Sequence, residues 1–254
     1  MAILSFDVGQ KNLAFCVINQ LGESIKIFKW DIIDISFDSS SDETMNNFIQ
    51  KYKKMKINEL KENMSKYGME TNNLKKKELL DKTKKYFIDN GLIKKDVSIM
   101  DTSLILVKKL DKLNILQDID TVLIENQPCM TNPTMKSVQM ILYTYFIIRG
   151  FIDSCQNTQT NYQLKTLKFI SASNKLKKCN NIEQFKNRTK NYKDRKKLAI
   201  EYCEYVLNNN DEQEKILYFN THLKKDDLAD CYLQAIYYID DFQEKNKPKK
   251  KKGK

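Results

Sequence analysis

Short apolar runs separated by polar turns open the chain. Residues 2–6 form a short apolar run, interrupted only by Ser5, that leads into Asp7, and residues 13–18 form a second apolar run after a polar turn. This pattern predicts a β-hairpin, and the β-rich stretch 24–35 predicts a third strand. On the buried side of the third strand we expect Ile25, Ile27 and Phe28.

A lysine-rich stretch with helical periodicity occupies residues 51–90. Its apolar positions repeat at helical spacing on both sides of a turn that contains Gly68, which predicts two short helices joined by an extended link. The polar residues 36–44 before it indicate a linker. A further helix is predicted over residues 98–113.

The second half of the chain alternates strand and helix signals. The predicted elements are a strand over 121–124 that ends at Glu125, a strongly apolar helix over 134–151, a strand over 167–171, and amphipathic helices over 193–207 and 226–242. Three strands, then alternating helices and strands, predict a mixed α/β fold with an early antiparallel hairpin, interrupted by an insert. The lysine tail that follows is predicted to be disordered.

Composition narrows the classes of function. Lys and Arg number 44 against 33 Asp and Glu, a net charge of +11. This balance favours a polyanionic partner, although the lysine tail alone could serve solubility or targeting. A single histidine and six widely spaced cysteines argue against a Ser-His-Asp triad, a zinc site and a disulfide framework. The cysteines indicate buried thiols in a reducing compartment.

Two further patterns are lacking in the sequence. The six glycines form neither a Walker loop nor a dinucleotide-binding fingerprint. The longest apolar stretch, residues 140–148, is too short to span a membrane, and the N-terminus resembles neither a signal nor a transit peptide. We therefore expect a soluble intracellular protein with no membrane partner.

Acidic residues stand at positions that are typical of active sites. Asp7 and Glu125 each close an apolar strand, where ligands collect in α/β folds, although either acid alone could be a solvated loop residue. Asp227 and Asp230 are three residues apart on a predicted helix, so their carboxylates point the same way. Asp226 suits the N-terminal end of that helix, where a negative charge meets the helix dipole.

Four carboxylates without an available histidine suit a hard cation. Mg²⁺ prefers oxygen ligands, and Mn²⁺ is able to substitute for it. Phosphodiester hydrolysis by a pair of metal ions uses such a cluster. The basic remainder of the chain would then hold the nucleic acid.

The order of these motifs resembles the RuvC-type Holliday junction resolvases of the ribonuclease H-like superfamily, and most of all their poxvirus and fungal mitochondrial branch. The segments that carry the resemblance are 4–14, 124–127, 171–176 and 226–230, within a match over 2–35 and 97–243. The resemblance implies an α/β ribonuclease H-like fold, a mixed five-stranded sheet flanked by helices, with a small helical insert.

The resemblance also implies an activity. It identifies Asp7, Glu125, Asp227 and Asp230 as catalytic, metal-binding acids of an endodeoxyribonuclease. Such an enzyme works as a homodimer on branched DNA and resolves four-way junctions by paired nicks. Two alternatives stay open, namely a ribonuclease H-like nuclease for flaps or RNA–DNA hybrids, and a non-catalytic DNA-binding protein on the same fold.

The insert has a resemblance of its own. Residues 57–80 are similar to a SAP motif, a helix–extended–helix module that binds DNA backbones, although a merely structural insert remains an alternative. We therefore expect three parts, a nuclease domain over 1–39 and 96–243, a SAP-like DNA-binding insert over 40–95, and a basic tail over 244–254.

Basic residues near these motifs are candidate phosphate contacts, although each could equally be a solvated surface charge. The candidates are Lys11, Lys75, Lys76, Lys77, Lys175, Lys177, Lys178, Arg195 and Lys196. The helix over 134–151 is expected to contribute to the dimer interface, because its apolar surface is broader than one core-facing stripe. The residues at helical spacing are Met135, Val138, Leu142, Tyr145 and Arg149, and those that broaden the surface are Ile141, Ile147 and Ile148.

The richness in asparagine and lysine suggests an AT-rich genome, such as that of a large DNA virus or a protist. We expect action at a cytoplasmic viral replication site if the chain is viral, and in the nucleus or mitochondrion otherwise.

Overall fold

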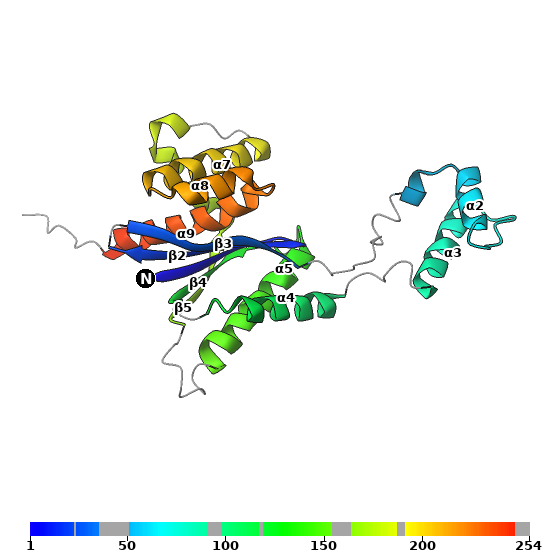
Figure 1. The fold of residues 1–254 in the computed structure, drawn as a ribbon, viewed down its shortest axis with the longest axis horizontal. Coiled ribbons are helices and arrows are strands. Elements are labelled where there is room, and N and C mark those ends of the chain that lie inside the picture. Colours follow the sequence, from blue (N-terminus) through cyan, green and yellow to red (C-terminus); the bar gives the residue numbers. More distant parts are fainter. Residues whose placement is uncertain are drawn as a thin grey trace, which may run out of the picture. The chain divides into compact units, whose positions relative to one another are not determined.

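The computed structural model describes residues 1–22, 24–35, 51–90, 98–116, 119–153, 164–186 and 191–246. The described residues divide into two compact units. We call the first, from segments 1–36 and 102–254, the core unit, and the second, from segment 37–101, the insert unit. Figure 1 shows the elements of both.

The core unit is built on a mixed five-stranded sheet with the order β3-β2-β1-β4-β5. Strands β1, β2 and β3 form an antiparallel meander, whereas β4 and β5 run parallel to β1. The predicted hairpin, third strand and two later strands are therefore confirmed. The strands are β1 (Ala2–Val8), β2 (Asn12–Leu21), β3 (Ser24–Asp34), β4 (Thr121–Asn126) and β5 (Thr166–Ser171).

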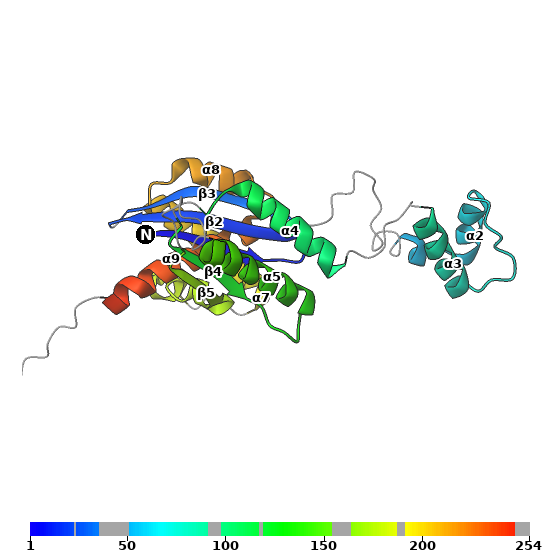
Figure 2. The ribbon, with the colours of Figure 1, turned by 90° about the horizontal axis from the view of Figure 1, so that it is seen from below.

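Helices cover both faces of the sheet, as Figures 1 and 2 show. One face carries α4 (Ile99–Leu113) and α5 (Pro133–Ile147), and the other carries α7 (Tyr192–Asn209), α8 (Gln213–Thr221) and α9 (Lys225–Asn246). Each face has its own apolar cluster, because alternate side chains of a strand point to opposite faces. The predicted sheet flanked by helices is thus confirmed.

A tryptophan fixes the last helix against the sheet. The Trp30 ring on β3 stacks on Phe219, with ring centroids 5.3 Å apart. Its indole N–H donates to the carbonyl of Leu228, in the first turns of α9, at 3.1 Å. Because the contact is buried, it sets the position at which α9 begins to cross the sheet.

Phe28 was expected on the buried side of the third strand, and this prediction is wrong. Its side chain is 61% exposed. The register between β2 and β3 shifts between Val17 and Ile18, so an extra residue stands in β3 at this point. Such a bulge reverses the alternation of side chains on one side of the irregularity.

The apolar helix after β4 also differs from the prediction. Regular α-helix ends at Ile147, and a π-helical segment, Ile148–Ile152, continues it. Gly150 lies in this segment, where an added Cβ would meet the Leu164 side chain at 3.0 Å. The π-helical turn at Gly150 is thus packed closely against Leu164.

Most of the stripe at helical spacing on this helix faces the core. Val138 and Leu142 are fully buried and Tyr145 is nearly so, because this side of α5 packs on the sheet. Arg149 forms ion pairs with Asp111 and Asp153. The dimer contact, expected from the apolar surface beyond this stripe, stays a prediction.

Several short elements were not predicted from the sequence. Helix α8 is one, and three 3₁₀ helices follow β5: Ala172–Leu176, Cys179–Asn181 and Glu183–Phe185. Short single turns lack the repeated apolar spacing on which helix prediction depends.

The cysteines are mostly as expected. Cys16, Cys179, Cys203 and Cys231 are buried free thiols, whereas Cys129 is exposed, and Cys155 lies outside the described residues. Within the described part of the chain, none of the helices is both long and apolar enough to cross a bilayer. Helix α9 extends to Asn246, into the predicted tail, and the remainder of that tail and the predicted linker 36–44 lie outside the described residues.

The described part of the insert unit includes the helices α2 (Ile57–Ser65) and α3 (Lys76–Asp89). They enclose a small apolar cluster that includes Leu60, Met64, Leu79 and Phe87. Gly68, in the link between the helices, has a φ of +70°, which favours glycine.

Candidate functional site

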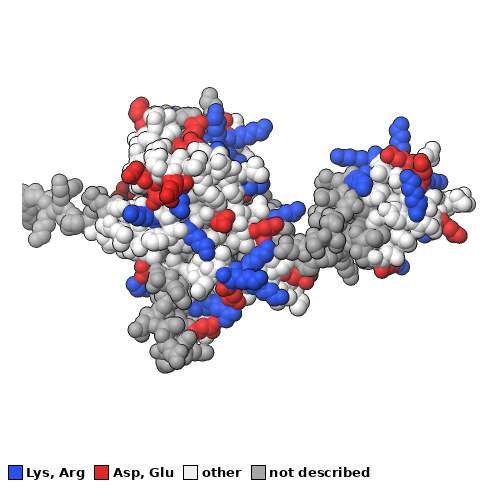
Figure 3. Space-filling model, viewed as in Figure 1, with Lys and Arg blue, Asp and Glu red and all other residues white. Residues whose placement is uncertain are grey.

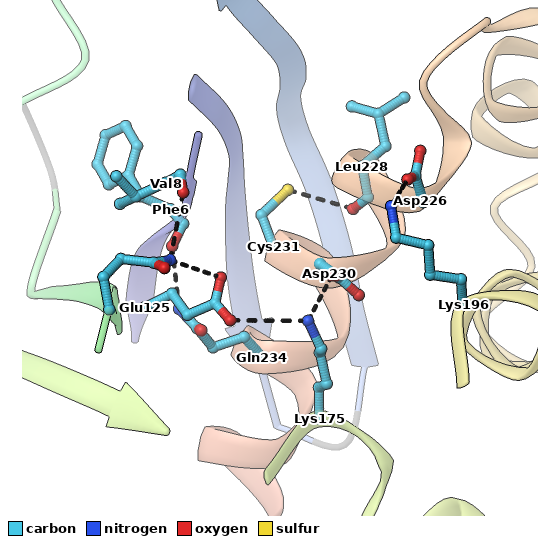
Figure 4. A network of polar contacts seen from close by, with 11 residues as sticks. Phe6, Val8, Glu125, Lys175, Lys196, Asp226, Leu228, Asp230, Cys231 and Gln234 are labelled. Atoms are coloured by element: carbon cyan, nitrogen blue, oxygen red, sulfur yellow. Dashed lines mark hydrogen bonds and ion pairs between the residues drawn. The ribbon is translucent and has the colours of Figure 1, made fainter. Parts of the chain in front are cut away.

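The acids singled out in the sequence converge on one pocket of the core unit. Asp7, Glu125, Asp227 and Asp230 all line a cavity of about 880 Å³. Asp7 lies near the end of β1 and Glu125 near the end of β4, and these two strands are parallel neighbours, so their carboxyl ends meet at one edge of the sheet. Helix α9 supplies the other two, Asp227 and Asp230, of which Figure 4 shows Asp230.

Asp7 and Glu125 are close enough to influence each other strongly. Glu125 is buried, at 7% exposure. Burial raises the pKa of the Asp7 carboxyl well above its usual value, and hydrogen bonding and charge repulsion from Glu125, with the charge of Asp230, raise it further. A second negative charge is therefore costly here unless a cation accompanies it.

A lysine ammonium lies among these acids. Lys175 follows β5 in the first 3₁₀ helix, and its Nζ contacts the Asp230 carboxylate and lies 3.8 Å from Glu125 Oε1 (Figure 4). Burial opposes the charge of Lys175, but the charges of Asp230, Glu125 and Asp7 raise its pKa above the ordinary value. Burial raises the pKa of Asp230 to about 6, although Lys175 works in the opposite direction.

The consecutive acids at the start of α9 have different surroundings. Asp226 accepts from Lys196 Nζ at 2.5 Å and is not among the residues that line the pocket. Although burial opposes it, this lysine lowers the pKa of Asp226. Asp227 lines the pocket, and burial, followed by the charge of Asp226, raises its pKa.

The basic candidates fall into three groups. Lys11, Lys175, Lys177, Arg195 and Lys196 line the pocket with the acids. Lys178 instead pairs with Glu244. Lys75, Lys76 and Lys77 belong to the insert unit, around the N-terminus of α3. On the face drawn in Figure 3, the Lys and Arg side chains are interspersed with acids.

Sequence reasoning assigned no role to several other residues of the pocket. Gln127 and the serines 171 and 173 lie within the motifs used above, and their hydrogen-bonding groups were the available signal. The hydroxyls of Ser171 and Ser173 are 2.9 Å apart. Tyr192 also lines the pocket, and nothing in its sequence context marks it.

The donor set fits a hard divalent cation, because it consists of carboxylate oxygens whose mutual repulsion a cation would relieve. As the side chains stand, however, no three His, Cys, Asp or Glu in the described segments are arranged to hold one ion. Lys175 places its positive charge against Glu125 and Asp230. Small movements of these side chains would therefore accompany binding of a cation.

Comparison by sequence gives one partial relative among curated proteins. Over 154 aligned residues, the chain is 44% identical to an uncharacterized protein of Acanthamoeba polyphaga mimivirus, and the match covers 56% of this chain and 36% of that protein. The chain thus spans about a third of that relative's length. No protein-family model matches the sequence.

Comparison by structure identifies the fold. The yeast mitochondrial Holliday junction resolvase is similar with a TM-score of 0.51 and 15% identity, over 93% of this chain and 78% of the resolvase. The fowlpox virus resolvase, in a complex with Holliday junction DNA, has a TM-score of 0.46 and 15% identity, over 95% of this chain and 99% of that resolvase. The chain has the fold of the RuvC-like resolvases, and the predicted ribonuclease H-like fold is confirmed.

The raised pKa of Asp7 predicts how stability depends on pH without divalent cations. The folded chain retains a proton that the unfolded chain releases above about pH 4, so this carboxyl makes wild-type stability fall as pH rises from there. Asp7→Asn removes this cost. In EDTA at neutral pH, the Tm of this variant should exceed that of wild type by about 2–4 °C for each kcal/mol gained in the free energy of unfolding. The difference in Tm should shrink in acid.

Asp226→Asn is the matched control, because Lys196 lowers the pKa of Asp226 and the charged form therefore stabilises the fold. This variant should be less stable than wild type at neutral pH. Thermal unfolding followed by circular dichroism measures both effects. A lower Tm for Asp7→Asn at neutral pH would contradict the electrostatic description of the pocket.

Proposed function

We propose that this chain is a divalent-cation-dependent endonuclease that resolves four-way DNA junctions by paired nicks. The observation that carries the proposal is the convergence of Asp7, Glu125, Asp227 and Asp230 on one pocket of a RuvC-like fold. The structural neighbour of this fold in yeast is a Holliday junction resolvase. Branched DNA is accordingly the proposed substrate.

The pocket contains the groups that phosphodiester hydrolysis needs. The four acids would hold Mg²⁺, for which Mn²⁺ could substitute. A cation bound there would stabilise the negative charge that develops on the phosphate. Lys175 is within reach of the acids and would offset part of the same charge, while Lys11 and Arg195, also at the pocket, would bind flanking phosphates.

A DNA-binding protein without catalysis is less compatible with this geometry. Desolvation and neighbouring acids already raise the pKa of Asp7 and Asp230, so their charges are costly even before DNA arrives. A phosphate backbone would add repulsion at the same place. Acids in such a pocket therefore favour chemistry that uses a cation.

We further propose that the enzyme is a homodimer, because a four-way junction has two-fold symmetry and needs two nicks. The buried stripe of α5 is not available for this contact. A groove of about 390 Å³ on α4 and α5 is available for it. Met140 and Ile148, which line this groove, are each 42% exposed. Apolar side chains at a surface groove suit an interface between protein chains.

The mimivirus relative supports a viral setting. We propose that the protein acts where viral DNA is replicated and recombined.

For the insert unit, we propose binding to the DNA backbone. Its helix–link–helix arrangement is the one the SAP resemblance implies, and Lys75 and Lys77 are exposed at the N-terminus of α3. Cations are unfavourable at this positive end of the helix dipole. A phosphate placed beside them would relieve that repulsion.

The acid assignment predicts a sharp contrast between neighbouring residues. Asp7→Asn and Asp230→Asn should each lower single-turnover junction cleavage by at least about 100-fold, since even outer-shell partners of a metal cost about 10–100-fold. Binding to the junction in EDTA should be retained or tighter, because repulsion of phosphate is reduced. Cleavage and electrophoretic mobility of a synthetic junction measure the two quantities.

Asp226→Asn is the matched control on the same helix, since Asp226 contacts Lys196 rather than the pocket. It should retain most of the cleavage activity. Near-wild-type cleavage by Asp7→Asn would refute the assignment, and loss at Asp226 with full activity of Asp227→Asn would mean that the wrong face of α9 was chosen.

The proposed role of the insert unit predicts a change in salt dependence. Replacing Lys75 and Lys77 together by Gln should make the slope of log affinity against log salt shallower by up to about 2, because each phosphate contact releases about 0.9 counterion. Single-turnover cleavage at saturating protein should be unchanged. As a charge-matched control, Lys26→Gln with Lys29→Gln, at exposed positions of β3, should leave the slope unaltered. An unchanged slope in the insert variant would argue for a structural insert.

A further inference from the structure

Two buried glutamines hold the strand that carries Asp7, and sequence analysis gave neither of them a role. Gln127 follows β4 and is 8% exposed, and Gln234 on α9 is 3% exposed. Each directs its side-chain amide N–H groups at carbonyl oxygens of β1. A buried amide that lost such partners would cost about 1–3 kcal/mol, so these contacts constrain where the neighbouring elements can lie.

Gln234 sets the position of α9 on the sheet. Its Nε2 donates to the Ser5 hydroxyl at 3.0 Å and to the carbonyl of Phe6 at 3.3 Å. Figure 4 shows Gln234 beside Phe6. Asp230 and Asp227 precede Gln234 by four and seven residues, so all three lie on one face of the helix. A glutamine anchored to β1 therefore fixes the rotation and height at which these two acids face Asp7.

Gln127 links β4 to the end of β1. The parallel register of these strands pairs residues as far as Phe6 and Ile124, so Val8 and Glu125 lie beyond the last pair. There the Gln127 Nε2 donates to the Val8 carbonyl at 3.2 Å and to Glu125 Oε2 at 3.3 Å. One amide thus joins the Glu125 carboxylate directly to the strand end beside Asp7.

A third glutamine, Gln139, holds the backbone of Gln127 in place. The N–H of Gln127 donates to Gln139 Oε1, on α5, at 2.8 Å, and Gln139 is fully buried. Within the described residues, the Nε2 of Gln139 has no hydrogen-bond partner. A buried unpaired amide is unfavourable, which indicates that the contact of its oxygen with Gln127 is maintained at some cost in stability.

We propose that Gln127 and Gln234 are positioning residues that hold together the elements carrying the four acids, so that only small side-chain movements are needed to bind a divalent cation. Their acceptors, Phe6 and Val8, flank Asp7, so β1 is fixed on both sides of that acid by the elements that carry the others. Like charges in one pocket repel one another and would otherwise separate. The inference rests on the proposed function, and it assigns the glutamines no contact with substrate.

The test uses Gln127→Met and Gln234→Met in the full chain, because Met keeps the length of the side chain and removes the donors. Titration calorimetry with Mn²⁺ alone, well below the unfolding temperature, should show affinity weakened by about 10-fold or more, the range of outer-shell partners of metals. The Mn²⁺ concentration that gives half-maximal single-turnover cleavage should rise by the same factor. Junction binding in EDTA should stay at the wild-type level.

Tyr232→Phe is the matched control. It removes a buried hydrogen bond of the same helix, between the Tyr232 hydroxyl and Asn210 at 3.3 Å, without touching β1 through that bond. It should lower Tm while leaving the Mn²⁺ affinity unchanged. If Gln234→Met fails to fold, Ser5→Ala removes one of the two acceptors of Gln234 and should weaken Mn²⁺ binding by a smaller factor.

The outcomes separate the two proposals. Wild-type binding and cleavage with unchanged Mn²⁺ affinity in the glutamine variants, whatever their Tm, would overturn the positioning role alone. Absence of Mn²⁺ binding by the wild-type chain, or binding that Asp230→Asn leaves intact, would overturn the proposed cation site and the positioning role with it. Weakened affinity in the glutamine variants but not in Tyr232→Phe would support the positioning role.

Discussion

Repulsion among the carboxylates of Asp7, Glu125 and Asp230 is the constraint around which the core unit is arranged. Together with Asp227 these acids line one pocket, and burial makes the charges of Asp7, Asp227 and Asp230 more costly than they would be in water. Lys175 offsets part of this cost by contacting Asp230 and lying near Glu125. The packing of β1, β4 and α9 opposes the remaining repulsion, because it leaves the acids little freedom to separate.

Three elements of the fold, β1, β4 and α9, bring the acids together. Parallel neighbours β1 and β4 bring two acids to the same edge of the sheet. Trp30, through its stacking on Phe219 and its hydrogen bond to Leu228, fixes where α9 begins, so that the third and fourth acids meet the first two. Burial of large apolar side chains therefore contributes most of the free energy that holds these elements together. The hydrogen bonds contribute less free energy and fix the orientation of the elements.

Much of this arrangement could be predicted from the sequence. Apolar strands that end in Asp7 and Glu125, and the three-residue spacing of Asp227 and Asp230, were sufficient to select the residues that the structure brings together. What could not be predicted depends on tertiary contacts. The bulge that exposes Phe28 requires knowledge of the partner strand, and Lys175 resembles any surface lysine until β5 places it among the acids.

Cleavage specificity tests the central claim most directly. The wild-type chain should be incubated with Mg²⁺ and four substrates of shared sequence, namely a four-way junction, a flap, an RNA–DNA hybrid and a linear duplex. The expected result is paired, symmetrically placed nicks in opposite strands of the junction, in preference to the other three substrates, and no cleavage in EDTA. Cleavage of the hybrid or flap in preference to the junction, or no cleavage of any substrate with Mg²⁺ or Mn²⁺, would contradict it.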